Sequence, residues 1–441
     1  MENVFIKGAD ISTLLEEIEA GAFYYDSKSG NPELEDYKTN PEELLTILKR
    51  YGFNSIRLRH WNDPYSSDGR KYGAGTNDEK SVMKLARLCK EAGMSILYDV
   101  HYSDFWADPG KQTMPKAWKG LSVDELTEKV YQFTLKTMKT FKENGTIPEY
   151  VQVGNEVTNG LMWPFAKKPS AEDMEEFTGQ NADSEERLVL GKKLKNIDPA
   201  IGNPYDNIAR FISAGIRAVR EVSPSTKIII HLDNGGNNPM YRDWFDNYMA
   251  RISNPKKDGV IKDCPMNQKD MRPCGPVEFI DAEDFDIIGL SYYPFWHGTM
   301  DELEFNLHDM AKRYGKPLVI AEVSTGFTME DYRHYEGNPE ELIGMATRPH
   351  LVEKVEYPMT KQGQCVFMLD FMNRVKSAPQ GLGFYYWEPA WIPVPNVGWA
   401  TKAALEYTGE KGLEGNEWAN QALFDYEGRA LPALKIIRDF N

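Results

Sequence analysis

The feature that most constrains the fold of this chain is a regular alternation of short apolar runs with amphipathic helical segments. Eight runs are apolar on both faces and rich in β-branched or aromatic residues, as is typical of parallel strands covered by helices. The predicted strands are residues 4–7, 55–59, 95–100, 150–153, 227–232, 285–292, 317–323 and 384–387. Eight β-then-α units favour one closed (β/α)8 TIM barrel over an open sheet.

Helical periodicity between these runs supports the same architecture. Segments 78–92 and 360–376 each place apolar residues on one stripe, which is an ordinary core face. Cys89 and Cys365 lie on those stripes, so we expect both to be buried thiols. Segment 431–440 supplies the last helix of the barrel.

Length and composition fit a single catalytic domain over residues 1–441. A chain of 441 residues suits one elaborated barrel, and 41% hydrophobic residues suffice for a large core. Three connections, 159–203, 255–284 and 325–358, are longer than turns require. They follow predicted strand ends, so we expect elaborated loops on the C-terminal face, where barrel enzymes carry their sites.

Charge and targeting signals exclude several classes of partner. The net charge of -16 argues against nucleic acid and anionic membrane, which both require a basic surface. The sequence contains neither a membrane-spanning stretch nor a secretory signal, so the numbered chain is expected to be cytoplasmic, or secreted if a leader has been removed. We expect a monomer. Cys264 and Cys274 flank a polar loop and can pair or stay free.

Two glutamates follow predicted strands on opposite sides of the barrel. Glu156 closes the fourth strand and Glu322 lies at the end of the seventh. A single glutamate after a strand is usually a solvated loop residue. Two that face each other across the barrel mouth match the needs of glycoside hydrolysis, with one acid to protonate the leaving oxygen and one carboxylate behind the anomeric carbon.

Neighbouring residues at the same strand ends support this pair. Asn155 is a candidate ligand of a sugar 2-hydroxyl, or else a strand-end turn former. Arg57 is expected to hold Glu322 ionised and lower its pKa, or else to form a structural salt bridge. Tyr293 can donate to Glu322 as well. Tyr292, one residue earlier on the strand, points the opposite way.

Aromatic residues and one histidine complete the predicted binding surface. His101 is a candidate sugar ligand or a regulator of the protonation of Glu156, and no metal-binding cluster accompanies it. Trp387 is expected to form an apolar floor under the sugar. Other tryptophans in polar, loop-like contexts suit stacking on sugar rings; these are Trp61, Trp106, Trp118 and Trp296.

At these residues the sequence resembles glycoside hydrolase family 53, the endo-β-1,4-galactanases, nearly end to end. The strings that carry the resemblance are residues 5–10, 57–64, 101–112, 154–156, 291–298, 321–322 and 387–393. The resemblance implies a retaining barrel enzyme with Glu156 as general acid/base and Glu322 as nucleophile. It also implies β-1,4-galactan or type I arabinogalactan as substrate, internal cleavage and no required cofactor.

The sequence departs from the family pattern in its loops. Bacterial relatives often bind calcium after the seventh strand, but residues 328–336 keep only part of the oxygen-ligand pattern, which disfavours a structural calcium site here. The expanded segments 159–203 and 255–276 shape outer subsites, so the preference for chain length does not follow from the resemblance.

Three alternatives remain at this stage. The same fold and mechanism can act on another polysaccharide such as mannan or cellulose. A sugar-binding protein without catalysis is disfavoured because both carboxylates and their supporting residues are present. A metal-dependent barrel lyase or isomerase is disfavoured by the lack of clustered ligands.

Overall fold

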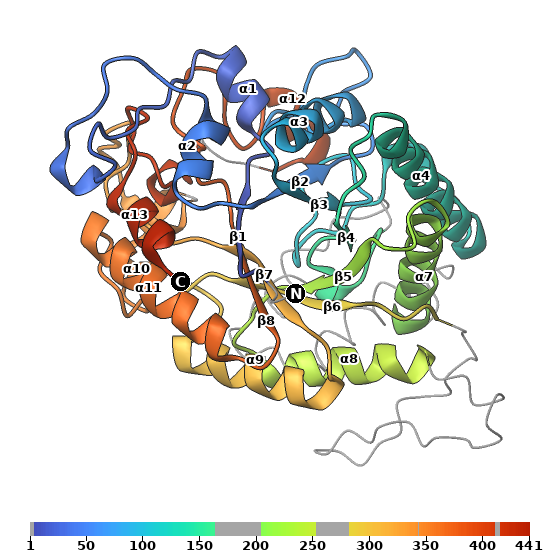
Figure 1. Ribbon diagram of the computed structural model, residues 1–441. Helices are drawn as coiled ribbons and strands as arrows, with labels where there is room; N and C mark the ends of the chain where they lie inside the picture. Colours follow the sequence, from blue (N-terminus) through green and yellow to red (C-terminus); the bar gives the residue numbers. More distant parts are fainter. Residues whose placement is uncertain (1–3, 164–203, 253–281, 343, 411–414) are drawn as a thin grey trace.

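The computed structural model describes residues 4–163, 204–252, 282–342, 344–410 and 415–441. Eight parallel strands close into a barrel in the chain order β1 to β8, with helices around the outside (Figure 1). The strands are β1 (Ile6–Asp10), β2 (Ser55–His60), β3 (Ser95–Val100), β4 (Tyr150–Val153), β5 (Lys227–Leu232), β6 (Ile287–Tyr292), β7 (Leu318–Val323) and β8 (Gly381–Tyr386). The predicted TIM barrel is confirmed.

Three strand predictions start two or three residues away from the observed strand. β6 starts at Ile287 rather than at Phe285, and the other two concern the seam where β1 meets β8. β1 starts two residues later than the predicted run, and β8 starts at Gly381 rather than at Phe384. Glycines near a strand end are typical of turns, and this biased the prediction. In the barrel, a Cβ on Gly383 would lie 2.1 Å from the backbone oxygen of Ile6. Glycine is needed there because the first strand closes tightly against the last.

The main helices begin and end at identifiable caps. Thr299 and Glu302 form a capping box at the start of α9, and Gly315 in the left-handed region ends it. Ser122 and Glu125 cap α4 in the same way. The α-helices are α1 (Leu14–Glu19), α2 (Leu44–Arg50), α3 (Glu79–Glu91), α4 (Val123–Glu143), α7 (Pro204–Val222), α8 (Asn238–Ile252), α9 (Met300–Tyr314), α10 (Pro349–Val352), α11 (Lys361–Ser377), α12 (Lys402–Thr408) and α13 (Pro432–Asp439).

Short 3-10 turns mark the loops between these elements. They are η1 (Pro32–Leu34), η2 (Lys116–Trp118), η3 (Val157–Asn159), η5 (Pro339–Glu341), η6 (Met345–Thr347) and η7 (Ala419–Gln421). The predicted helices 78–92, 360–376 and 431–440 correspond to α3, α11 and α13 within one or two residues at each end. Cys89 and Cys365 are buried free thiols, as predicted.

Apolar packing occurs on both sides of the barrel wall. The larger core lies between the strands and the surrounding helices. A separate apolar cluster fills the interior near the amino ends of the strands. In β5, Ile228 and Ile230 belong to the outer core and Ile229 to the inner cluster, which shows the alternation expected of a strand.

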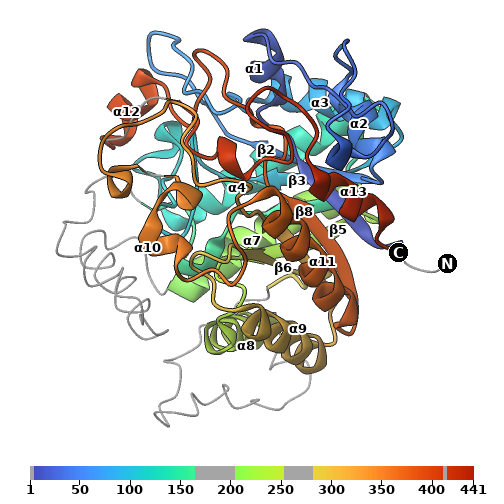
Figure 2. The same cartoon turned by 90° about the vertical axis from the view of Figure 1, so that its left-hand side faces the viewer.

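The chain termini and the long connection 325–358 lie at different ends of the barrel. The described ends of the chain lie close together beside β1 and α13 (Figure 2). Connection 325–358 contributes Met345, Ala346 and Leu351 to a cluster that also contains Tyr293 and Trp387, so it packs at the carboxyl ends of the strands. The other long connections, with Cys264 and Cys274, fall mostly outside the described residues. Among the described helices, none has the length and apolar character that crossing a membrane requires.

Candidate active site

A strained turn after β4 places Glu156 at the barrel mouth. Gly154 has φ 83°, and a Cβ there would lie 2.6 Å from Val157 and 2.7 Å from Leu161. Glu156 itself adopts the left-handed conformation, with φ 46° and ψ 52°. That conformation costs a non-glycine residue about 1–2 kcal/mol, and it persists because the surrounding structure holds the turn. The turn directs the Glu156 side chain toward β6, where its Oε1 lies 2.6 Å from the Ser291 hydroxyl.

Glu322 lies inside β7, opposite an irregularity in the neighbouring strand. The pairing of β6 with β7 shifts between Leu290 and Ser291, so that Ser291 pairs with Glu322. Such irregularities re-aim side chains near active sites. Arg57 Nη2 contacts Glu322 Oε1 at 2.9 Å, and the Tyr293 hydroxyl donates to Oε2 at 2.7 Å. The structure therefore brings Arg57, Tyr293 and Glu322 together.

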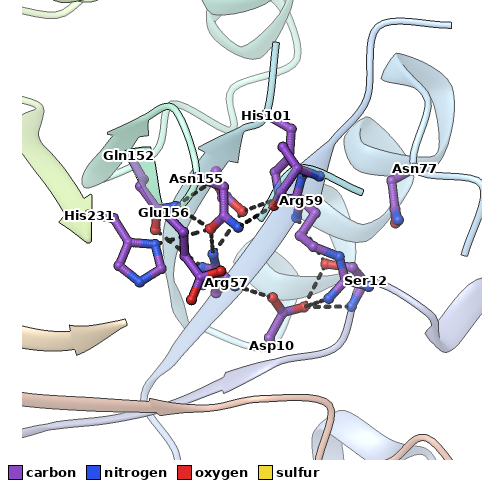
Figure 3. A network of polar contacts seen from close by, with 12 residues as sticks. Asp10, Ser12, Arg57, Arg59, Asn77, His101, Gln152, Asn155, Glu156 and His231 are labelled. Atoms are coloured by element: carbon purple, nitrogen blue, oxygen red, sulfur yellow. Dashed lines mark hydrogen bonds and ion pairs between the residues drawn. The ribbon is translucent and has the colours of Figure 1, made fainter. Parts of the chain in front are cut away.

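Arg57 is the hub of a fully buried polar network (Figure 3). Its Nη1 donates to Asp10 at 2.8 Å. Its Nη2 donates to Asp99 and to Asn155 Oδ1, each at 2.8 Å. A buried guanidinium requires such partners because an unpaired charge away from water is costly. The two alternatives for Arg57 thus coincide, because it forms structural salt bridges and also holds Glu322.

Asn155 connects the two sides of the site. Its Oδ1 accepts from Arg57 Nη2, from Gln152 Nε2 at 2.9 Å, and faces His231 Nδ1 at 3.0 Å. Its Nδ2 donates to the backbone oxygen of Ala107 at 2.8 Å. These contacts fix the orientation of the amide, and contact with a sugar hydroxyl stays a prediction.

The surroundings of Glu156 differ from those of Glu322. The Ser291 hydroxyl lies 2.6 Å from Glu156 Oε1, and it also contacts His231 Nε2 at 2.8 Å. Burial raises the pKa of Glu156 well above its ordinary value, and the negative charges of Glu322 and Asp233 act in the same direction. Glu156 is therefore suited to keep its proton at a higher pH than an ordinary glutamate does.

Burial also raises the pKa of Glu322, while Arg57 and the Tyr293 hydroxyl oppose this shift. A net lowering of the Glu322 pKa was our expectation, and it was wrong because desolvation outweighs the ion pair. The cation and the donated hydroxyl still distinguish this carboxyl from Glu156. When one proton is shared between the two, it favours Glu156.

His101 is engaged on both sides of its ring. Nε2 contacts Asp99 Oδ2 at 2.9 Å, and Nδ1 accepts from Trp61 Nε1 and from the backbone NH of Ala107, both at 3.2 Å. Only 1% of the residue is exposed. The structure therefore places His101 behind the site, where it orients Asp99 and the loop after β3.

The predicted stacking tryptophans separate into two groups. Trp61 and Trp118 are 0% and 5% exposed. Both predictions were wrong, because these rings pack into apolar clusters instead of facing solvent. Trp296 is half exposed, so its ring is accessible to a ligand.

Trp106 and Trp387 are partly buried neighbours, with ring centroids 6.1 Å apart. Arg59 lies over the Trp106 ring at 4.6 Å, and Trp106 Nε1 donates to the Trp399 carbonyl at 3.0 Å. Trp387 meets the Tyr293 ring edge-to-face at 6.3 Å. Trp387 therefore lies beside the tyrosine that binds Glu322. Tyr292 lies in the outer core, stacked on Phe367, and points away from the site as predicted.

Several polar residues of the site were given no role in the sequence analysis. They are Asp10, Asp99, Gln152, His231 and Ser291. A usable signal was present, because each is a polar residue in an apolar strand, at a position whose side chain points into the barrel. His231 follows Ile229 at a spacing of two, and Asp99 follows Leu97 in the same way.

Residues 328–336 do not fit a calcium site. Asp331 pairs with Arg333 at 2.7 Å, and the same guanidinium contacts Glu417 at 3.1 Å. Across the described ranges, no three His, Cys, Asp or Glu side chains gather closely enough to hold a metal ion. A cation after β7 would compete with a guanidinium that already binds these carboxylates.

Two buried carboxyls at the carboxyl ends of barrel strands, with an arginine, a tyrosine and tryptophans around them, define a glycoside hydrolase of the TIM-barrel type. Comparison with known proteins agrees. The profile described as "Glycosyl hydrolase family 53" matches residues 6–258 and 277–437, and the chain belongs to this family.

Individual relatives span nearly the whole chain. The Bacillus subtilis (strain 168) "Endo-beta-1,4-galactanase" is 31% identical over 99% of this chain and 86% of its own length. The Niallia circulans "Uncharacterized protein in bgaB 5'region" is 35% identical over 99% of this chain and 94% of its own. The solved "Ignisphaera aggregans GH53 catalytic domain" matches with a TM-score of 0.73 and 33% identity, over 99% of this chain and 96% of that one.

Proposed function

We propose that this enzyme cleaves internal β-1,4-galactosidic linkages of galactan or type I arabinogalactan with retention of configuration. Family membership and the galactanase name of the Bacillus subtilis relative support the linkage. One observation carries the assignment of roles. Arg57 and Tyr293 bind Glu322, whereas Glu156 is hydrogen-bonded to the neutral hydroxyl of Ser291.

In the first step, a Glu322 oxygen attacks the anomeric carbon while Glu156 gives its proton to the departing glycosidic oxygen. The raised pKa of Glu156 suits it to be the acid. Arg57 and Tyr293 orient the Glu322 carboxylate and stabilise its negative charge before the bond forms. The products are a covalent galactosyl ester on Glu322 and a chain with a free hydroxyl.

In the second step, Glu156 is a carboxylate and acts as the base. It takes a proton from water as the water oxygen attacks the anomeric carbon. The ester bond to Glu322 breaks, and the carboxylate returns to Arg57 and Tyr293. Both carboxyls thereby recover their starting protonation.

A reducing-end assay on β-1,4-galactan, mannan and cellulose tests the substrate. Galactan should be hydrolysed far faster than the others, and equal rates would refute the proposed specificity. Undiminished activity in chelator is expected, because the proposed steps use side chains alone.

Glu156→Gln should lose about 10²- to 10⁴-fold in activity on galactan, as removal of a general acid does. Wild-type activity in that variant would refute the role of Glu156.

A 2-fluoro-galactoside with a good leaving group tests the nucleophile. Peptide mapping should find the label on Glu322, and a label elsewhere would overturn the assignment. Proton NMR of the first product tests retention, because the β-anomer should appear before mutarotation. Initial release of the α-anomer would contradict double displacement.

A further inference from the structure

A chain of hydrogen bonds links Glu156 to Asn155 through Ser291 and His231. It runs from Glu156 Oε1 to Ser291 Oγ at 2.6 Å, to His231 Nε2 at 2.8 Å, and from His231 Nδ1 to Asn155 Oδ1 at 3.0 Å. Ser291 and His231 are both 0% exposed. Protein atoms alone therefore determine the direction of each bond.

The orientation of Asn155 sets the direction at the far end. Its Nδ2 donates to the Ala107 carbonyl at 2.8 Å, so its Oδ1 faces Arg57, Gln152 and His231. An amide oxygen can only accept. His231 Nδ1 must therefore carry a hydrogen.

The state of the other ring nitrogen follows from the surroundings of His231. Burial and the positive charge of Arg57 on β2 lower the pKa of His231 well below its ordinary value. Among the other facing groups, Asp99 on β3 opposes this shift, and His101 and His297 add to it. The ring is neutral, so Nε2 has a free lone pair. That nitrogen can accept the hydrogen of the Ser291 hydroxyl whenever this hydroxyl does not donate to Glu156 Oε1.

Ser291 Oγ can then only accept from Glu156, which requires a protonated carboxyl. The charged groups that act most strongly on Glu156 are Glu322 on β7, Asp233 after β5 and Asp108 after β3, and all three favour this state. Resting on the proposed acid/base role, we propose that the Ser291 hydroxyl is a two-position switch. It donates to His231 while Glu156 holds its proton, and to Glu156 once that carboxyl is ionised.

The switch follows the two steps of the reaction without net proton transfer through the chain. In the first step the Glu156 hydrogen leaves Ser291 Oγ and passes to the leaving oxygen, and the Ser291 hydrogen turns from His231 Nε2 to the Glu156 Oε1 that is now ionised. When Glu156 takes a proton from water, the hydrogen turns back. His231 keeps its Nδ1 hydrogen throughout. Ser291 and His231 are thus positioning residues, which supply a partner to each protonation state of Glu156.

A double-mutant cycle on the full-length chain tests this inference. His231→Asn keeps an amide donor near the Nδ1 position but removes the Nε2 acceptor. The Ser291 hydrogen is then always free for ionised Glu156, so the basic limb of kcat/KM should move to lower pH by about half to one unit. In the Ser291→Ala background, His231→Asn should not move this limb, because His231 acts only through the missing hydroxyl.

An equal shift in both backgrounds, or no shift in either, would overturn the switch, since a purely structural role of His231 does not depend on the Ser291 hydroxyl. If a variant fails to fold, ¹⁵N NMR of the His231 imidazole in the wild-type protein shows which ring nitrogen carries the hydrogen. Nδ1 should carry the hydrogen and Nε2 should not. The opposite tautomer or an imidazolium refutes the switch. If Glu156→Gln loses activity but the double-mutant cycle does not give the expected result, only the switch is wrong. Full activity in Glu156→Gln refutes the acid/base role of Glu156 on which the switch rests.

Discussion

The barrel interior has a lower layer near the amino ends of the strands and an upper layer at their carboxyl ends. Both layers are built from the same strands, but one is apolar and the other polar. Near the amino ends, the inner cluster consists of Ile6, Leu97, Ile229, Ile287, Val319 and Tyr385. At the carboxyl ends, the buried inner residues include Asp10, Arg57, Asp99, Gln152, His231 and Glu322. In β3 and β5 the change from apolar to polar takes only two residues.

This contrast separates stability from chemistry. Full burial of a large apolar side chain stabilises the fold by about 1.5–3 kcal/mol, so the lower layer supports the barrel. Buried ion pairs such as Arg57 with Asp10 roughly balance their desolvation, so the upper layer adds little net stability. The upper layer holds charges in place for the reaction. Four substitutions test this division.

The largest effect is expected for Glu322→Gln in the upper layer. Loss of the proposed nucleophile should lower kcat on galactan on the order of 10⁴-fold, as for other catalytic residues that act as a unit. The melting temperature should not fall, because a buried carboxyl with a raised pKa is replaced by a neutral amide. Steady-state kinetics and thermal unfolding measure both; strong destabilisation would show that this layer supports the fold.

Arg57→Met should affect both properties. It leaves Asp10, Asp99 and Glu322 without their shared cation, which costs about 3–5 kcal/mol of unfolding free energy. Arg57 lowers the pKa of Glu322, so its loss raises that pKa further. The nucleophile must be ionised, and the acidic limb of kcat/KM should therefore move to higher pH. Arg57→Lys, which keeps a charge, is the control and should shift the limb less.

Tyr293→Phe should have a smaller effect confined to chemistry. It removes a hydrogen bond to a charged group, worth about 1.5–3 kcal/mol, so activity should fall about 10- to 100-fold. The pKa of Glu322 should rise, since this hydroxyl lowers it, and the acidic limb should move upward. Tyr292→Phe is the matched control, because its hydroxyl donates to the Gly298 carbonyl. An equal shift in both variants would contradict the assignment.

The smallest effect is expected in the lower layer. Ile229→Val removes one methylene beneath His231 on the same strand and should cost about 0.5–1.5 kcal/mol of unfolding free energy. Urea denaturation measures this cost. Neither kcat nor the pH profile should change, because the residue contacts the apolar cluster rather than the reacting groups. A shifted pH limb would show that the two layers are coupled.

Much of this architecture was predictable because strand and helix periodicity are local properties of the chain. The eight strands and the helices α3 and α11 followed from residues a few positions apart. β8 was placed three residues late, because Gly383 is explained by its contact with β1, which lies far away in sequence. Trp61 was misjudged for a similar reason, since its polar neighbours do not reveal the aromatic cluster that buries it.

The sequence by itself determined the barrel, the end of the barrel that carries the site, and the two glutamates on strands at opposite sides of its mouth. These follow from periodicity and from the order of residues along the chain. Only the tertiary structure decided the protonation preference of each glutamate. Arg57 and Tyr293 were expected beside Glu322, but only the folded barrel shows that burial outweighs their effect on its pKa and that Glu156 contacts Ser291. Electrostatic energies in a buried site depend on distances in space, and spacing along the chain does not encode them.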